Sequence, residues 1–368
     1  MRTNIINKKK ILLIIPSLDR GGTENVCINL FKEFLNKKYD VKLLVLNKQR
    51  ENFFYKEIDK KQREKIIFSK NYNWFSIFID LKELTKKNKF NTIISFNNET
   101  AFLVILIKFF LKRNYKIILR VNNSLKNKIK YSENFLVAYK KKIYYFISLF
   151  LSDKIVVQSQ EMSSEIQRFN ISKSKIQVIY NPISKIFKKV PVLKTKKRYF
   201  LFVGSLTFKK NPLMLLEIYK KFKSLNIQNI KLKIIGKGDQ YYYLKNFIIN
   251  NNLSNDIELI NEVNQYKLKN IYTNAFCLII SSRYEGFPNV AIECLHSGTP
   301  ILAYKGIGGI KELIKPNING IIVNYYTIAS YVKGLKKIIK TKFNRNKIKG
   351  TAKKFNINRV IEDYEEFI

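Results

Sequence analysis

The sequence predicts an α/β protein of two doubly wound parallel-sheet (Rossmann-like) domains that face a cleft. Short apolar runs alternate with helical patterns along the 368 residues, and this alternation is typical of parallel sheets with crossover helices. The alternation stops once, at Asn181-Pro182, and starts again at Tyr199. Because the residues between are rich in Lys and Pro and have no apolar period, they indicate a linker between two domains.

In the first domain, runs of Ile, Leu and Val identify strands that are buried on both faces of the sheet. We expect these strands at Lys10–Ile15, Val41–Leu46, Lys65–Ser69, Thr92–Phe96, Lys116–Val121, Lys154–Gln158 and Ile176–Tyr180. Helical spacing of apolar residues predicts helices at Asn25–Leu35, Phe75–Lys86, Ala101–Leu111 and Glu161–Phe169. The basic, aromatic segment Lys126–Leu151 fits either a domain helix with a solvated side or a helix in a membrane interface.

The second domain repeats the pattern. Its strands are expected at Tyr199–Val203, Lys231–Ile235, Ile257–Ile260, Ala275–Ile280, Pro300–Tyr304 and Gly320–Val323. Its helices are expected at Leu213–Phe222, Tyr241–Asn250, Tyr266–Asn274 and Asn289–Ser297, with a helical turn at Ile310–Ile314 and further helices after Val323. We therefore expect a first domain at residues 1–182, a linker at 183–198, a second domain at 199–350 and a final helix at 351–368.

The composition restricts the classes of partner and chemistry. The net charge of +42 calls for an anionic partner, but Lys greatly outnumbers Arg, which favours a membrane surface or compositional bias over specific nucleic-acid recognition. The 3 cysteines form no CxxC pair, and His296 is the single histidine, so the composition argues against a His/Cys metal site and against a Ser–His–Asp triad. No apolar stretch is long enough for a signal peptide or an anchor, so a cytoplasmic protein is expected.

The stretch from Ser281 to Pro300 carries the strongest functional pattern. It follows a buried strand, passes through the loop Glu285-Gly-Phe-Pro288, and continues as a helix with Pro288 at its expected first position. Ligands and anions bind at such a site, beside the carboxyl end of a strand and a helix N-terminus. Glu285 and Glu293 lie here, eight positions apart. Because both belong to one loop–helix unit, they fit ligand binding better than the flanking acid pair of a glycosidase.

Other loops at strand ends are rich in lysine and glycine. Lys209 and Lys210 follow Gly204 in one loop, and Gly236 follows the next strand. Lysines beside helix N-termini and exposed amides can hold a diphosphate, and nearby carboxylates suit sugar or ribose hydroxyls. A nucleotide or a nucleotide sugar is the ligand that combines these groups. Each element alone has a simpler explanation, such as a surface lysine or a helix cap.

Gly21 and Gly22 lie between the first strand and the first helix. Glycines at this place allow close approach of a ligand to the backbone, although a plain tight turn would also explain them. The full GxGxxG dinucleotide pattern is absent.

These residues resemble those of the large retaining glycosyltransferase family of glycosyltransferase-B (GT-B) fold, often called glycosyl transferases group 1. Glu285 and Glu293 resemble that family's E-x7-E motif, within the similar surroundings SSRYEGFPNV and ECLHSGTP. Gly21-Gly22-Thr-Glu24 is similar to its first glycine loop, and Val203-Gly-Ser-Leu with Lys210-Asn is similar to its diphosphate loop. The resemblance covers essentially the whole chain.

The resemblance implies transfer of a sugar from a nucleotide donor to an acceptor hydroxyl, with retention and without a metal or other cofactor. The expected donor is a UDP-sugar, with a GDP-sugar as the alternative, and the acceptor is a glycan or lipid-linked glycan at the inner face of the cytoplasmic membrane. Glu285 and Lys210 would be the catalytic residues, and the final helix would cross back onto the first domain. The donor-binding residues would be Glu293, Gly286, Phe287, Asn289, Val290, Gly204, Lys209, Gly236, Gly21 and Gly22.

The chain also departs from the family pattern. Ser205 stands where many members have an arginine, which leaves Lys210 and Lys209 to meet the diphosphate charge. Asn122 and Asn123 stand where many have a histidine. A front-face mechanism, in which the departing phosphate accepts the proton, needs no such base. The alternatives are a non-catalytic basic protein that binds polyanions or membrane surfaces, and a phosphorylase or epimerase of the same fold.

Overall fold

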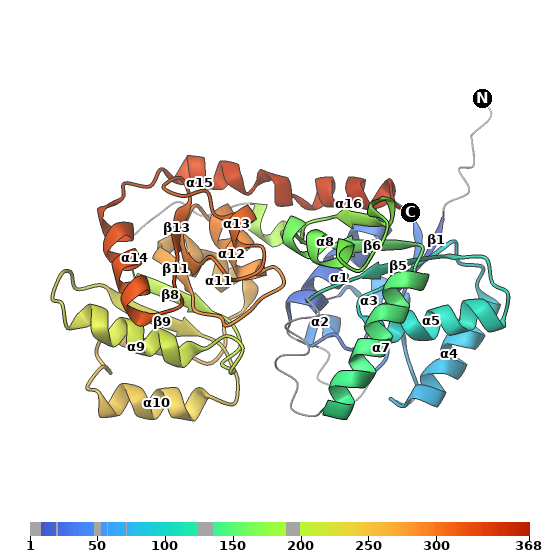
Figure 1. Ribbon diagram of the computed structural model, residues 1–368, viewed down its shortest axis with the longest axis horizontal. Helices are drawn as coiled ribbons and strands as arrows, with labels where there is room; N and C mark the ends of the chain where they lie inside the picture. The colour runs from blue at the N-terminus through green and yellow to red at the C-terminus, as the bar shows by residue number, and fades with distance from the viewer. Residues whose placement is uncertain are drawn as a thin grey trace. The chain divides into compact units, whose positions relative to one another are not determined.

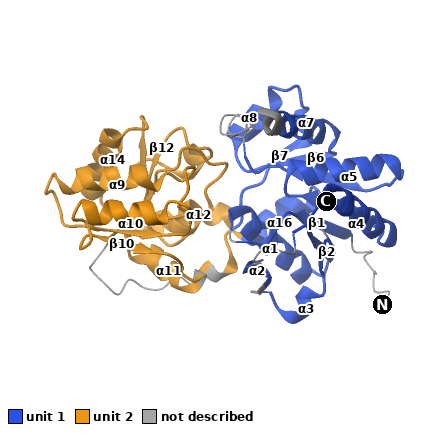
Figure 2. Ribbon diagram, turned by 90° about the horizontal axis from the view of Figure 1, so that it is seen from below, with its two compact units in different colours: residues 1–182, 357–368 blue, residues 183–356 orange. Residues whose placement is uncertain are grey.

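The computed structural model describes residues 9–19, 21–47, 53–56, 58–70, 72–123, 135–188 and 199–368. It divides into unit 1, which comprises residues 1–182 and 357–368, and unit 2, which comprises residues 183–356 (Figure 2). Each unit is an α/β domain with its own parallel sheet and its own core, which confirms the predicted pair of parallel-sheet α/β domains. The predicted linker residues 189–198 and the segment 124–134 lie outside the described residues.

The sheet of unit 1 has seven parallel strands within the described residues, in the order β3-β2-β1-β4-β5-β6-β7. Strands β1, β5 and β6 of this sheet are labelled in Figure 1. The order runs outward in both directions from β1 and β4, as in a doubly wound fold. Apolar runs form these strands because helices cover both faces of the sheet. The strands are β1 (Lys10–Ile15), β2 (Asp40–Val45), β3 (Ile66–Phe68), β4 (Thr92–Ser95), β5 (Lys116–Arg120), β6 (Lys154–Val157) and β7 (Ile176–Val178).

The helices of unit 1 follow its strands and begin at recognisable caps. Asn73, Asn97 and Ser159 each accept a hydrogen bond from a backbone amide in the first turn of the helix that follows. These elements are α1 (Gly22–Asn36), α2 (Phe53–Lys56), α3 (Lys60–Arg63), α4 (Trp74–Lys87), α5 (Asn98–Phe110), α7 (Phe135–Leu151), α8 (Gln160–Gln167), η1 (Lys173–Lys175) and α16 (Ile357–Glu365).

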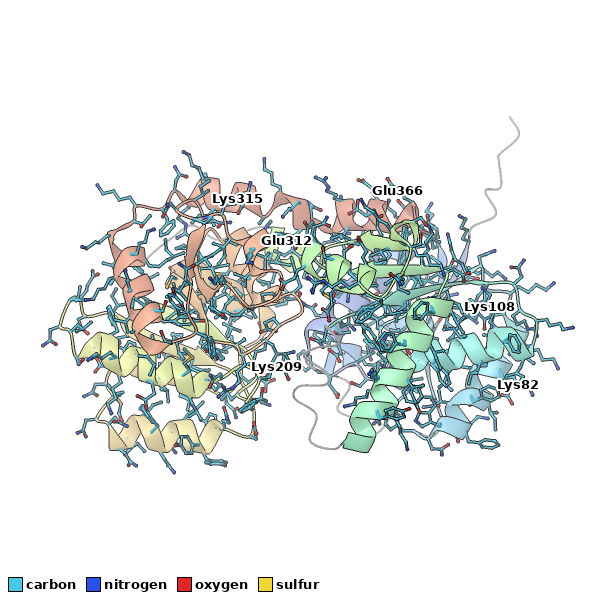
Figure 3. The ribbon with its side chains drawn as sticks, viewed as in Figure 1. Lys82, Lys108, Lys209, Glu312, Lys315 and Glu366 are labelled. Carbon is cyan, nitrogen blue, oxygen red and sulfur yellow. The ribbon has the colours of Figure 1, made fainter. Side chains whose placement is uncertain are left out.

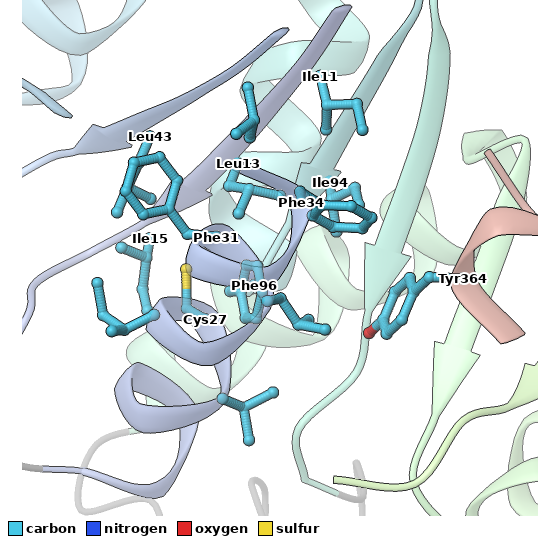
Figure 4. Close-up of a cluster of buried hydrophobic side chains, with 14 of the residues drawn as sticks. Ile11, Leu13, Ile15, Cys27, Phe31, Phe34, Leu43, Ile94, Phe96 and Tyr364 are labelled. Atoms are coloured by element: carbon cyan, nitrogen blue, oxygen red, sulfur yellow. The ribbon is translucent and has the colours of Figure 1, made fainter. Parts of the chain in front are cut away.

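Helix α16 belongs to the core of unit 1 although all of unit 2 precedes it in the chain. Its residues Ile357, Val360, Ile361 and Tyr364 are buried among side chains of β1, β2, β4 and α1. Figure 4 shows Tyr364 in this cluster with Phe34 and Phe96. The Tyr364 ring makes an edge contact with Phe34, with ring centroids 6.3 Å apart. The apolar stripe of this helix therefore closes one face of the first sheet.

The sheet of unit 2 has six parallel strands, in the order β10-β9-β8-β11-β12-β13, and every strand lies within the described residues. They are β8 (Tyr199–Val203), β9 (Lys231–Ile235), β10 (Ile257–Ile260), β11 (Ala275–Ile280), β12 (Ile301–Tyr304) and β13 (Gly320–Val323). The helical elements are η2 (Lys185–Lys188), α9 (Pro212–Lys223), α10 (Tyr241–Asn250), α11 (Gln265–Asn274), α12 (Asn289–His296), α13 (Ile310–Leu313), α14 (Ile328–Lys340), α15 (Arg345–Thr351) and η3 (Lys353–Phe355).

Some elements differ from the sequence prediction. Helix α1 begins at Gly22 instead of Asn25. Gly21 is its cap, with an extended backbone, and Gly22 occupies the first turn although glycine is a poor helix former. Pro288 is the cap of α12 and not its first residue; its backbone is extended and its carbonyl accepts from the Ala291 amide. The single-turn helices α2 and α3 are too short to show a period. Within the described residues, no helix is long and apolar enough to cross a bilayer.

Candidate functional site

The strand order of unit 2 reverses between β8 and β11, and the loops after these strands meet at one edge of the sheet. In doubly wound sheets such a reversal leaves a crevice where ligands bind. The Arg283 amide donates to the Lys209 carbonyl over 2.9 Å. The Ser281 hydroxyl donates to the carbonyls of Lys210 and Asn211, each over 3.1 Å. Residues 204–211 and 281–288 are therefore held against each other.

The Glu285 carboxylate is the centre of this edge and is only 6% exposed. The Lys210 ammonium donates to its Oε1 atom. The Ser282 hydroxyl donates to the same oxygen over 2.7 Å, and Lys209 Nζ lies 3.9 Å from Oε2 (Lys209 is labelled in Figure 3). The structure therefore brings together three residues that the sequence predicted as site residues: Glu285, Lys209 and Lys210.

The charges of this cluster determine its protonation. Burial by itself would raise the pKa of Glu285, but the ammonium groups of Lys210 and Lys209 and the hydrogen bonds from Lys210 and Ser282 hold that pKa below its usual value. Burial lowers the pKa of Lys209, against the opposing effect of Glu285. One carboxylate beside two lysines leaves a net positive site, which suits an anionic ligand such as a phosphate.

A second group of residues, which sequence reasoning missed, holds the lysine loop in place. The Tyr326 hydroxyl donates to the Ser281 carbonyl over 2.6 Å and accepts from the Asn211 side chain over 2.8 Å. Asn211 has a left-handed backbone, with φ of 49°, directly before Pro212 at the start of α9. Tyr326 thus joins the loop after β13 to the loops after β8 and β11. The sequence Lys210-Asn-Pro indicates the start of a helix and so points to Asn211, whereas nothing in the polar loop around Tyr326 points to that residue.

Glu293 lies on α12 and has partners of its own. Its Oε2 atom accepts a hydrogen bond from the Tyr272 hydroxyl over 2.9 Å. Burial raises the pKa of Glu293 to about 7, and the hydrogen bond from Tyr272 opposes part of that rise. Glu285 is therefore held ionised by lysines, whereas Glu293 titrates near neutrality. The two glutamates of the predicted motif have different electrostatic environments, which fits different roles.

Two glycines of this edge are required by close packing. A Cβ atom at Gly236 would lie 1.8 Å from the Gly204 carbonyl oxygen, so the loop after β9 could not approach the loop after β8. Gly309 caps α13 with φ of 70°, and a Cβ atom there would lie 2.3 Å from the Phe287 ring. Gly236 and Gly204, both predicted as donor-binding residues, thus let the backbones of their two loops pack closely together.

The remaining predicted residues of this loop surround the start of α12. Gly286 and Phe287 are buried, and the Phe287 ring packs on Phe355 with centroids 5.9 Å apart. Asn289 and Val290 are half-buried in the first turn of the helix. The N-terminus of α12, with its partial positive charge, therefore lies next to the Glu285 loop.

In unit 1, Gly21 and Gly22 lie at the N-terminus of α1, at the end of the loop after β1. The Asn25 amide donates to the Gly21 carbonyl over 3.0 Å, as in an ordinary first turn. A Cβ atom at Gly21 would meet only the end of the flexible Glu24 side chain. The geometry is that of a helix N-terminus with exposed backbone, and the binding role of these glycines stays a prediction.

Asn122 is engaged in a buried network of unit 1. Its Oδ1 atom accepts from Arg120 and its Nδ2 atom donates to the Phe96 carbonyl. Arg120, 2% exposed, also donates to Asn181 and, over 3.2 Å, to the Tyr364 hydroxyl. Both ends of the Asn122 amide are therefore used inside the fold.

His296, the single histidine, is not part of the Glu285 cluster. Burial lowers its pKa, and its hydrogen-bond partner is the backbone of Phe187. Within the described residues, no three His, Cys, Asp or Glu side chains gather as a metal site would require.

Comparison with known proteins identifies the chain. The family model described as "Glycosyl transferases group 1" matches residues 184–355, and that described as "Glycosyltransferase Family 4" matches residues 20–185. An uncharacterized glycosyltransferase of Methanocaldococcus jannaschii is 30% identical over 223 residues. The match covers 57% of this chain and 56% of that protein, so the chain spans about half of its length.

Two further proteins match along nearly their whole length, one in sequence and one in structure. The N-acetylgalactosamine-N,N'-diacetylbacillosaminyl-diphospho-undecaprenol 4-alpha-N-acetylgalactosaminyltransferase of Campylobacter jejuni is 26% identical, over 98% of this chain and 99% of that protein. The structure of Anabaena HepE with UDP and glucose has a TM-score of 0.79 at 14% identity and covers 98% of this chain and 99% of that chain, which shows the shared fold. The two family models together span residues 20–355, and the chain belongs to the glycosyl transferases group 1 family of GT-B fold.

Proposed function

We propose that this glycosyltransferase moves a sugar from a UDP-sugar to a hydroxyl of a lipid-linked or polysaccharide acceptor, with retention at the anomeric carbon. The observation that carries the proposal is the buried Glu285 carboxylate with Lys209 and Lys210, at the strand-order reversal of unit 2. A diphosphate beside these lysines and the N-terminus of α12 would have its charge met by cations and amides. The site would then need no metal ion.

The reaction requires little acid–base chemistry from the protein. The bond between the sugar C1 and the phosphate oxygen breaks, and the acceptor oxygen bonds to C1 on the same face. The acceptor proton passes to the departing phosphate. Lys210 and Lys209 would stabilise the negative charge that develops on that phosphate. Glu285 would accept hydrogen bonds from the donor sugar, and Glu293 from the ribose.

The relatives support the classes of donor and acceptor. The name of the Campylobacter jejuni enzyme describes transfer to a sugar on a diphospho-undecaprenol lipid. The Anabaena structure contains UDP and glucose. The net charge of +42 also fits work at the cytosolic face of a membrane, where anionic lipids attract basic proteins.

A nucleotide-sugar panel tests the donor. Purified protein is heated with UDP- and GDP-sugars, and a bound donor raises the unfolding temperature. Lys210→Ala should weaken donor binding about tenfold or more, because a charge-assisted contact to the diphosphate is lost. Lys223→Ala is the matched control, since it removes a lysine from a 2.6 Å ion pair with Asp256 elsewhere in unit 2.

The reaction itself is tested by its products. Retention predicts that the new linkage has the anomeric configuration of the donor, which NMR of the product resolves, and that chelators leave the rate unchanged. Inversion, or a rate that needs added metal, would contradict the mechanism. Salt-sensitive binding to polyanions without protection or turnover by any nucleotide sugar would favour the non-catalytic alternative.

A further inference from the structure

Unit 1 has a strand-order reversal of its own, between β1 and β4, and a cavity lies there. Pro16 follows β1, Leu46 follows β2 and Asn97 follows β4, and all three line the cavity. Its volume of about 450 Å³ lies within the range of small-molecule sites. The carboxyl ends of strands at a reversal are where doubly wound sheets bind ligands.

Aromatic side chains form part of the lining of this cavity. Trp74 and Tyr144, from α4 and α7, both line it, and their ring centroids are 5.1 Å apart with planes inclined by 31°. Phe102 of α5 supports Tyr144 from 5.0 Å. Trp74 is 45% exposed and Tyr72, also in the lining, is 57% exposed. Large rings kept partly in water, on a packed aromatic base, suit a ligand with one apolar face and many hydroxyls, such as a sugar ring.

Polar groups also line the cavity. Asn97 donates to the Glu99 carboxylate over 3.1 Å, and its Oδ1 atom caps α5 through the Thr100 amide over 2.8 Å. The half-buried Glu99 has further acceptor capacity toward the cavity that it lines. Lys140 and Lys141 of α7 also line the cavity, are exposed, and form no ion pair within the described part of the chain. A carboxylate for hydroxyls and two unpaired lysines for an anion are thus combined in one cavity.

We propose that this cavity binds a sugar of the acceptor together with the phosphate that the sugar carries. The sugar ring would pack on Trp74 and Tyr144, its hydroxyls would donate to Glu99, and the phosphate would be attracted by Lys140 and Lys141. The assignment of this ligand to the acceptor rests on the proposed function, whereas the cavity and its lining do not. Trp74, Tyr144 and Glu99 are then specificity-determining residues for the acceptor.

The chain offers a direct measurement, because Trp74 is its single tryptophan. The intrinsic fluorescence of the full chain therefore reports the cavity. The probes are the 1-phosphates of glucose, galactose, N-acetylglucosamine and N-acetylgalactosamine, and the matching methyl α-glycosides. We expect a saturable change of Trp74 fluorescence, tighter for at least one sugar phosphate than for its methyl glycoside, that persists in Lys210→Ala.

Two matched variants test the role of the lysines. Lys140→Ala with Lys141→Ala should weaken sugar-phosphate binding about threefold or more and leave methyl glycosides unchanged, since only the charged contact is removed. Lys86→Ala with Lys87→Ala removes the same charge from the last turn of α4 and should change neither.

The outcomes separate this inference from the proposed function. Donor protection without any saturable change of Trp74 fluorescence would overturn the cavity assignment and leave the proposed function in place. A saturable change with no donor protection would support the cavity and remove the proposed function. A change that is abolished by Lys210→Ala would place the probes at the donor site and also overturn the inference.

Discussion

Lys210→Ala should leave the Glu285 carboxylate buried with one distant lysine and one hydroxyl. In the native fold Lys210 bonds to Oε1 directly, whereas Lys209 Nζ is 3.9 Å from Oε2 and the Ser282 hydroxyl is 2.7 Å from Oε1. Removing one partner of a buried pair costs about 3–5 kcal/mol, because the other charge stays out of water. Since Lys209 and Ser282 remain, we expect the lower end, about 3 kcal/mol.

This loss should be visible as a lower unfolding temperature of unit 2. For a domain of this size, about 1 kcal/mol shifts the transition by about 2–4 °C, so Lys210→Ala should lower it by about 6–12 °C. Calorimetry of the full chain measures both units, and fluorescence of the single tryptophan, which lies in unit 1, identifies the transition of that unit. Adding Glu285→Gln should restore much of the loss, because no buried charge is left unpaired.

The dependence on pH provides a second check. The pKa of Glu285 is lower in the folded chain, so its stabilising contribution is present above the unfolded pKa and is lost as pH falls through the folded pKa. The stability that Lys210→Ala loses relative to the native chain should therefore be smaller in acid, where the Glu285 carboxyl takes up a proton. If Lys210→Ala lowers the transition no more than Lys223→Ala does, the carboxylate does not depend on Lys210 and the reasoning fails.

Three further perturbations test other parts of the fold. Glu293→Gln should stabilise unit 2 at pH 8 but not at pH 4, because burial raises the pKa of the carboxyl to about 7 and its favourable protonated form is lost as pH rises. Equal differences in melting temperature between the variant and the native chain at the two pH values would contradict this. Gly236→Ala should cost about 1–3 kcal/mol through contact with the Gly204 carbonyl, and an unchanged melting temperature would show that the loops can separate. Tyr364→Phe leaves Arg120 Nε without its acceptor and should lower the stability of unit 1 by about 1–3 kcal/mol, as measured by Trp fluorescence in urea; no change would mean that water replaces the hydroxyl.

The bounds of the strands could be predicted closely, because strands buried on both faces of a parallel sheet consist of short apolar runs. Tyr199–Val203, Ile257–Ile260 and Gly320–Val323 have the same bounds in the sequence prediction and in the structure. Helix starts were less certain, since a cap depends on the backbone of a single residue. Gly21 and Pro288 show this, because each is the residue before its helix.

The candidate site could be predicted as loops but not as contacts. The glutamate and lysine positions came from local patterns, yet Lys210 and Glu285 are 75 residues apart, and only the order of β8 and β11 brings them together. Tyr326 and Trp74 were not predicted as site residues, because each lies beside another aromatic residue, Tyr325 or Phe75, and the local pattern does not show which ring faces a site. Their roles depend on which loops the sheet places side by side.

The position of α16 has a consequence for biosynthesis. Unit 1 takes part of its core from Ile357, Val360 and Ile361, which the ribosome adds after the whole of unit 2. An N-terminal domain usually folds while the rest of the chain is being made, but this one lacks a packing partner for α1 until synthesis has passed residue 357. During that interval Phe34 lacks the contact with the Tyr364 ring. A chain interrupted after unit 2 would therefore carry its defect in the other unit, and we expect chaperones to bind unit 1 of such nascent chains.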